Sequence, residues 1–352
     1  MTAKHTNIQW LDTLRTLAIV GVVIIHVSSP LVNMTYGKNL HFWWIGNVVD
    51  SAVRFAVPLF LMLSGATLLG KEYKLSEFYK RRFTRVLIPF LFWMVAYWVY
   101  RWLLLYPKIQ PHDLQGIVQW ATNLFLLEGV SKHFWYIYMI LFLYLFVPFL
   151  GKALQKLNLS VISWVLLVWV VLTFACKSIP LNMYSWSGDY GSKLLGYVLY
   201  SGYMVLGYYL LKLPVCTAKT RFAAALVFLL TVAVSAFFTY LFSKNNHKLD
   251  LTMYSYLGVN TIIQSIAIFM LVKDLTFENR HLYQTFETVS KYSYGIYLVH
   301  IIIISIMFDH GIYWGIAHPL ISLPVITLMV LVCSFAIIYV FRILPGGKRV
   351  TG

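Results

Sequence analysis

The stretch LDTLRTLAIVGVVIIHVSSP, residues 11–30, decides how the rest of the sequence is interpreted. It is apolar and long enough to cross a bilayer, yet it contains Arg15 and His26. Eleven residues separate the two, which places them roughly 20° beyond three full helical turns and about 16 Å apart along the axis, on one helix face. Asp12 lies one turn before Arg15, within reach to pair with it. Ionisable side chains inside a membrane are costly, so Asp12, Arg15 and His26 are predicted to belong to a functional site.

The composition predicts an all-α, polytopic integral membrane protein. Of the 352 residues, 60% are hydrophobic and only 11% are charged, whereas soluble domains are about 25% charged. No internal repeat or appended soluble domain is visible, so residues 1–352 are expected to form a single transmembrane domain. About ten apolar segments have the length of a membrane span. They are 10–31, 47–70, 86–106, 134–151, 159–176, 194–212, 222–243, 253–272, 292–309 and 319–342.

The basic residues predict which way the chain crosses the membrane. Lysine and arginine are dense in the connection after the second span, residues 71–85, and they recur after the later even-numbered spans and at the C-terminus. The opposite connections contain fewer of them, so the positive-inside rule places both termini in the cytoplasm. The net charge of +16 is therefore attributed to topology and not to a nucleic-acid partner. The segment from Leu114 to Leu127 is predicted to be an interfacial or re-entrant helix rather than an eleventh span.

Three arginines in or beside the second and third spans are candidate ligand-binding residues. Arg54 opens RFAVPLFLMLSG, residues 54–65, where it could either snorkel to the interface or face a cavity. Arg82 and Arg85, three apart, share one helix face at the start of the third span. Guanidinium groups bind phosphates through two hydrogen bonds at once, so this pair suits a phosphate-bearing ligand. The alternative is a topology signal or a contact with lipid headgroups.

Two further motifs combine histidine with aromatic residues. His133 and Trp135 lie in KHFWY, residues 132–136, which reads either as an interfacial aromatic belt or as a corner that binds a sugar. Tyr297 and His300, three apart in KYSYGIYLVH, residues 291–300, are placed to hydrogen-bond between helices, structurally or within the site. No cluster of histidine and acidic residues has the spacing of metal ligands, so no metal is expected.

Taken in order, five motifs resemble the acyltransferase-3 family of integral membrane O-acyltransferases. They are R-x10-H in the first span, PLF-x3-SG in the second, R-x2-R before VLIP at the third, HFWY at the fourth and SYGIYLVH in the ninth. The resemblance covers essentially the whole chain. It implies an enzyme of the bacterial inner membrane that moves an acyl group, with acetyl favoured, from cytoplasmic acyl-CoA to a hydroxyl of a lipid-linked or exported surface glycan. The expected partners are therefore acyl-CoA, the glycan acceptor and membrane lipids, with no nucleic acid.

The resemblance also implies roles for individual residues. It makes His26 the essential histidine and Arg15 its paired basic residue. Arg82 and Arg85 match the motif that engages acyl-CoA from the cytoplasm. The other polar positions that match are Asp12, Arg54, His133 and His300.

Acyl transfer from a thioester to a hydroxyl agrees with this assignment, since it needs a base, and an imidazole serves either as general base or as covalent acyl carrier. A glycan or lipid exporter, whose transport path the same residues would line, is the rival interpretation. The sequence shows no paired broken helices of the kind that many transporters have, which argues against it. A purely structural subunit leaves Arg15 and His26 unexplained.

Overall fold

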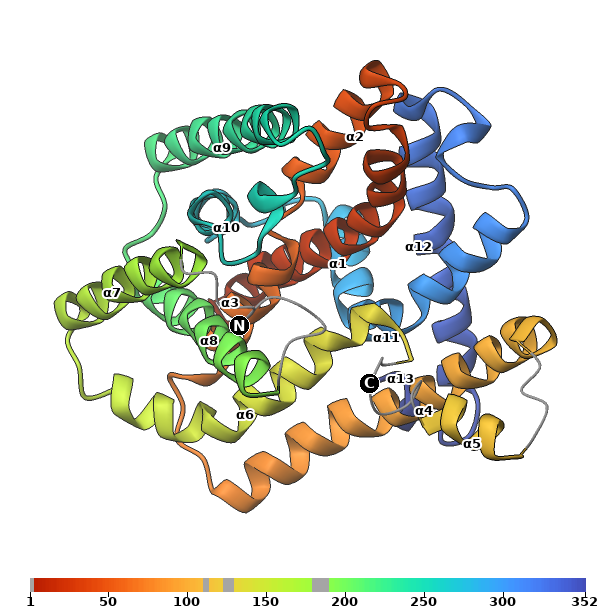
Figure 1. Cartoon of the computed structure of the whole chain (residues 1–352). Helices are drawn as coiled ribbons and strands as arrows, with labels where there is room; N and C mark the ends of the chain where they lie inside the picture. Colours follow the sequence, from red (N-terminus) through yellow and green to blue (C-terminus); the bar gives the residue numbers. More distant parts are fainter. Residues whose placement is uncertain (1–2, 110–113, 123–129, 179–189) are drawn as a thin grey trace.

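The structure, a computed structural model, describes residues 3–109, 114–122, 130–178 and 190–352 (Figure 1). Within these residues the regular structure is helical throughout. The α-helices are α1 (Ala3–Thr35), α2 (Leu40–Ala52), α3 (Ala56–Leu68), α4 (Leu75–Ile109), α5 (Leu114–Thr122), α6 (Trp135–Leu154), α7 (Leu159–Ser178), α8 (Tyr190–Lys212), α9 (Ala218–Asn245), α10 (Val259–Val272), α11 (Arg280–Asp309), α12 (Pro319–Ile343) and α13 (Lys348–Thr351). Short 3-10 turns are η2 (Lys132–Phe134), η3 (Thr252–Tyr254) and η4 (Trp314–Ile316).

The predicted class, an all-α protein with many membrane spans, is confirmed. In the described part of the chain, 8 helical segments are long and apolar enough to cross a membrane. The segment Leu159–Ala175 of α7 is apolar but shorter, and α8 adds a helix of 23 residues. All ten predicted spans fall on helical segments. The side of the membrane on which each terminus lies stays a prediction.

The second predicted span, 47–70, falls on the candidate span Leu40–Leu68, which is interrupted because α2 ends at Ala52 and α3 begins at Ala56. Pro58 stands in the first turn of α3, where its missing N–H breaks no helical hydrogen bond. Broken backbone is tolerated at membrane depth only where protein encloses it. The Leu40–Leu68 segment fits this rule, since its apolar window is 72% buried and those of the other seven spans are 28–56% buried.

The long connection after α4 contains the helix α5, whose 9 residues are too few to span a bilayer. This agrees with the prediction that the connection holds no eleventh span. The rest of the predicted segment, residues 123–127, lies outside the described residues. Its interfacial or re-entrant position stays a prediction.

Helix α1 lies at the centre of the bundle and packs against α2, α3, α11 and α12 (Figure 1). Helices α1, α4 and α11 run in the same direction. Thr16 of α1 donates a hydrogen bond to the carbonyl of Phe286 in α11, at 2.8 Å. Tyr294 of α11 donates to the carbonyl of Val86 in α4, at 2.7 Å, and further along the amide of Ile302 donates to the Tyr97 hydroxyl. The N-terminal halves of these three helices therefore meet at one end of the bundle. It is called here the arginine end because it holds residues 15, 82 and 85.

Two glycines bring α3 and α8 into backbone contact. A Cβ atom on Gly65 would collide with the backbone of Met204, and one on Gly207 would collide with the backbone of Met62. Small residues at such crossings let membrane helices approach closely, and dispersion contacts then hold them together. The SG of the predicted PLF-x3-SG motif is thus part of a helix–helix interface.

Candidate active site

Three histidines from three helical elements meet beside α1. The His26 ring of α1 lies 5.2 Å, between ring centroids, from His300 of α11 and 6.4 Å from His133 of η2. His133 and His300 are themselves 5.2 Å apart. His133 and His300 are buried, whereas His26 is half-buried. The structure therefore brings together three predicted site residues that are more than a hundred residues apart in the chain.

Hydrogen bonds fix the two buried rings and leave one nitrogen of each free. Nδ1 of His300 donates to the carbonyl of Tyr297 at 2.7 Å, so a neutral His300 carries its lone pair on Nε2. Nδ1 of His133 is hydrogen-bonded to the Ser131 hydroxyl at 2.7 Å. Tyr297 donates its hydroxyl hydrogen bond to the carbonyl of His133 and so joins α11 to η2. Within the described residues, Nε2 of both rings is buried without a partner, as expected of nitrogens that meet a substrate.

The pairing predicted for Asp12 and Arg15 is present at the arginine end. Arg15 Nη1 lies 3.4 Å from Asp12 Oδ1 and donates to Ser290 Oγ at 3.0 Å. Ser290 and Tyr283 both donate to the Asp12 carboxylate, at 2.6 and 3.1 Å. Arg15 and His26 thus both face α11, which confirms that they share one face of α1. Ser290 and Tyr283 were not predicted, since nothing in their local sequence shows which helix faces Asp12.

Arg54 is buried and faces the interior, which resolves the alternative left open for it. It forms an ion pair with Asp50, four residues earlier, and its guanidinium lies 4.0 Å from the centroid of the Tyr254 ring. Asp50 also accepts a hydrogen bond from the Ser29 hydroxyl of α1, at 3.3 Å. Arg54 is close enough to His26 for the two to interact electrostatically. Asp50 was missed from the sequence, although its i,i+4 spacing from an intramembrane arginine was a usable signal.

Trp135 belongs to the same flank as Arg54. Its ring stacks on Tyr256 with centroids 5.8 Å apart and planes 21° apart. The Arg54 guanidinium lies 6.0 Å from the centroid of that Tyr256 ring. Trp135 is therefore part of an aromatic wall beside the buried ion pair rather than of an outward-facing belt.

Arg82 and Arg85 lie in the N-terminal third of α4, away from the histidines. Arg82 is half-buried and lies 6.0 Å from the centroid of the Phe78 ring, while Arg85 is exposed. Arg85 is close enough to Arg15 for their charges to repel. In the described part of the chain neither Arg82 nor Arg85 forms a salt bridge, whereas the neighbouring Arg81 pairs with Glu77. The arginine end therefore presents uncompensated positive charge.

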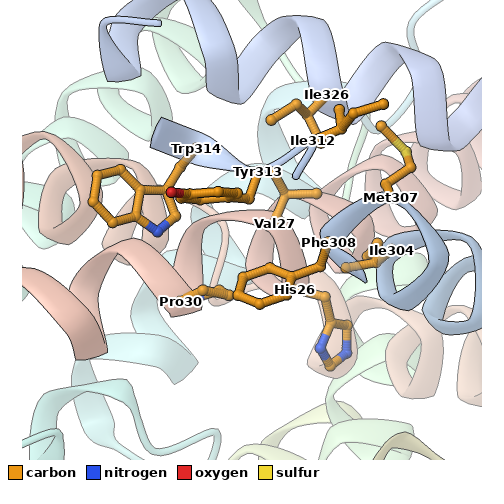
Figure 2. Close-up of a pocket in the computed structure, with 10 residues that line it drawn as sticks. All are labelled: His26, Val27, Pro30, Ile304, Met307, Phe308, Ile312, Tyr313, Trp314 and Ile326. Carbon is orange, nitrogen blue, oxygen red and sulfur yellow. The ribbon is translucent and has the colours of Figure 1, made fainter. Parts of the chain in front are cut away.

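A pocket with about 300 Å³ of empty space borders His26 on the side away from Arg15. Figure 2 shows its ten lining residues, with the His26 imidazole at one end and Ile312 and Ile326 at the other. Met307 and Phe308, near the end of α11, form one wall. In the part of the chain that the structure describes, no group of three histidine, cysteine or acidic residues is arranged to hold a metal ion.

The fold and this centre define a multi-span helical membrane protein with a histidine site in its interior and a cationic end. A family model described as an acyltransferase domain matches residues 8–341. The chain belongs to the acyltransferase-3 family, and this membership implies an acyltransferase that uses an acyl donor and an acceptor. Neither a search of curated proteins nor a search of solved structures found a match to the chain.

Proposed function

We propose that this acyltransferase takes an acyl group, with acetyl favoured, from cytoplasmic acyl-CoA and places it on a hydroxyl of a lipid-linked or exported surface glycan. The observation that carries the proposal is the histidine cluster, where His26 stands beside two rings that each keep one nitrogen without a hydrogen-bond partner among the described residues. The bacterial inner membrane is the compartment that fits a cytoplasmic donor and an exported acceptor.

The cationic end is the proposed entry point of the donor. Coenzyme A carries several phosphate charges, and Arg82 and Arg85 offer two guanidinium groups that form no salt bridge with any described residue. The positive-inside rule puts this end in the cytoplasm. Both chain ends lie near it, since Gln9 accepts a hydrogen bond from the Phe277 amide and Arg342 lies over the Tyr292 ring. This supports the prediction that both termini are cytoplasmic.

Arg15 is proposed to orient the donor between that entry point and the histidines. It lies about 16 Å from His26 along the axis of α1, a span that the extended pantetheine arm of coenzyme A can cover. Asp12, Ser290 and Tyr283 hold the guanidinium against α11. Because these hydrogen bonds fix the Arg15 guanidinium before the donor binds, the side chains around it need little rearrangement when the donor binds.

In the reaction, the acceptor hydroxyl oxygen attacks the thioester carbon and the carbon–sulfur bond breaks. His26, acting as general base, takes the hydroxyl proton and passes it to the departing sulfur, so that free coenzyme A thiol leaves. Alternatively His26 first accepts the acyl group itself and then passes it to the acceptor. Single-turnover trapping of an acyl-histidine distinguishes the two routes.

The flank formed by Arg54 and Trp135 is the proposed acceptor side. The Trp135–Tyr256 stack offers aromatic surface for the apolar face of a sugar, and Arg54 keeps a buried Nε without a hydrogen-bond partner among the described residues. Asp50 neutralises the arginine and holds it in position. Tyr297 and His300 are proposed to form the other wall of the acceptor site. Their rings lie together on α11, and the Tyr297 hydroxyl donates a hydrogen bond to the carbonyl of His133 in η2.

The test is release of thiol from radiolabelled acetyl-CoA, with the label followed into glycan. We expect His26→Ala to lower transfer at least about a hundredfold, because a positioned base contributes roughly 10²–10⁴ to the rate. His281→Ala, an exposed histidine at the start of α11, is the matched control and should retain activity. If purified protein neither binds nor consumes acetyl-CoA while glycan export fails without it, the site belongs to an exporter and the proposal is wrong.

A further inference from the structure

The pocket beyond His26 has a fixed place relative to the donor's proposed path. Along α1 the order is Arg15, His26 and then Pro30, which lines the pocket. Helix α11 runs parallel, with Ser290 beside Arg15, His300 beside His26 and Ile304 in the pocket wall. A molecule that enters at the arginine end and reaches the histidines therefore meets this pocket next.

The chemistry of the walls excludes a saccharide as the occupant. Eight of the ten lining residues are apolar or aromatic side chains other than tyrosine and histidine. The polar atoms offered are those of His26, the Tyr313 hydroxyl and the Trp314 indole N–H, which has no hydrogen-bond partner among the described residues. A sugar ring here would leave most of its hydroxyls unpaired, at a cost for each one. The flank formed by Arg54 and Trp135 offers a charged group and aromatic surface for a sugar, and it comes from α2, the turn between α2 and α3, the start of α6 and the η3–α10 segment. It shares no residue with this pocket.

We propose that this pocket receives the donor's acyl chain beyond its carbonyl carbon and sets the longest chain that the enzyme transfers. This inference rests on the proposed function. With the coenzyme A phosphates at Arg82 and Arg85 and the thioester at His26, the acyl chain points away from Arg15, into the apolar walls. The pocket borders His26 and its walls are mostly apolar, so an acyl chain longer than acetyl meets apolar side chains there.

The apolar lining of the pocket determines how much kcat/KM is expected to change with the length of the acyl chain. Each methylene that leaves water for an apolar pocket is worth up to about fourfold in an equilibrium or rate constant. The kcat/KM should therefore rise from acetyl-CoA to butyryl-CoA and fall once the chain no longer fits. Ile304 is the residue to change, because it is half-buried in the wall and one helical turn beyond His300.

The experiment measures thiol release from acetyl-, butyryl- and hexanoyl-CoA in membranes that contain the wild type or one variant. The readout is the ratio of kcat/KM for hexanoyl-CoA to that for acetyl-CoA, in which a general loss of activity cancels. We expect Ile304→Phe to lower the ratio at least about tenfold by filling the pocket, and Ile304→Ala to raise it at least about threefold. Ile306→Phe is the matched control, since Ile306 is 43% exposed on the same helix and lies outside the pocket, and it should leave the ratio unchanged.

The outcomes separate this inference from the function on which it rests. A ratio that neither Ile304 substitution moves overturns the inference even if acetyl transfer is normal. Substitutions that change the KM for the glycan acceptor, with the donor ratio constant, place the acceptor in the pocket and also overturn it. If no acyl-CoA supports thiol release by the wild type, the proposed acyltransferase reaction itself fails. Ile304→Ala creates space rather than a clash, so the test holds even if Ile304→Phe does not fold.

Discussion

Replacing Asp12 by asparagine tests whether the hydrogen bonds at the arginine end hold the donor-orienting residue in place. The side chain keeps its shape but loses its charge and one of its two acceptor oxygens. In the native protein, Ser290 and Arg15 share Oδ1, at 2.6 and 3.4 Å, and Tyr283 donates to Oδ2 at 3.1 Å. The amide nitrogen of an asparagine must therefore face at least one donor, so at least one hydrogen bond is lost.

The magnitude follows from these contacts. A hydrogen bond to a charged group contributes about 1.5–3 kcal/mol. The Arg15 side chain is 36% exposed, so its ion pair is screened by solvent and adds no more than about 1 kcal/mol. The two contributions together give about 1.5–4 kcal/mol, which corresponds to a loss of roughly 10- to 900-fold in kcat/KM for acyl-CoA if Arg15 loses its orientation. Tyr283→Phe removes one bond only and should cost about tenfold.

The assay is thiol release at varied acetyl-CoA, together with thermal unfolding of the purified protein in detergent. Glu77→Gln is the matched control, because Glu77 forms ion pairs at the start of α4 but its side chain is 57% exposed. Such surface pairs contribute about 0–1 kcal/mol, so this variant should stay within about fivefold of the wild type. The reasoning is refuted if Asp12→Asn is no more impaired than Glu77→Gln.

Two further substitutions test the fold and the donor site. Gly207→Ala should prevent the close approach of α8 to α3 and lower the free energy of unfolding by about 3 kcal/mol or more, because the new Cβ meets backbone rather than a flexible side chain. A thermal-shift assay measures this loss. The control is Gly70→Ala, whose Cβ would make an ordinary 3.5 Å contact and which should leave the stability nearly unchanged. Arg85→Lys should raise the KM for acetyl-CoA about tenfold without changing kcat, since lysine cannot make the two-pronged phosphate contact. Arg81→Lys, whose arginine is already paired with Glu77, should change neither constant, and equal effects at the two positions would contradict the assignment.

The features that were predictable from the sequence are those that depend on one helix. The shared face of Arg15 and His26 and the Asp12–Arg15 pair follow from the 3.6-residue period alone. The places of the spans follow from apolar length, because the bilayer thickness sets that length. The family follows from short motifs whose order is preserved along the whole chain.

The features that were missed depend on how helices meet. Hydropathy does not encode the register between helices, because lipid and a neighbouring helix are equally apolar surroundings. The sequence therefore identified His133 and His300 but not their distances to His26. The break between α2 and α3 was missed for a related reason. A turn that protein encloses does not have to be built from polar residues that hydrogen-bond to water. Val53 and Phe55 are therefore apolar, and the sequence around them looks like an uninterrupted apolar helix.

The parallel packing of α1 and α11 has a consequence for how the protein is made. A ribosome synthesises the chain from the N-terminus, so Arg15 enters the membrane long before Ser290, its partner 275 residues later. Until α11 arrives, neither Ser290 nor Tyr283 is present to hold the charges of α1. Asp12, three residues away, is there from the start. Their pairing therefore matters first for inserting the charged end of α1, and only afterwards for the finished site.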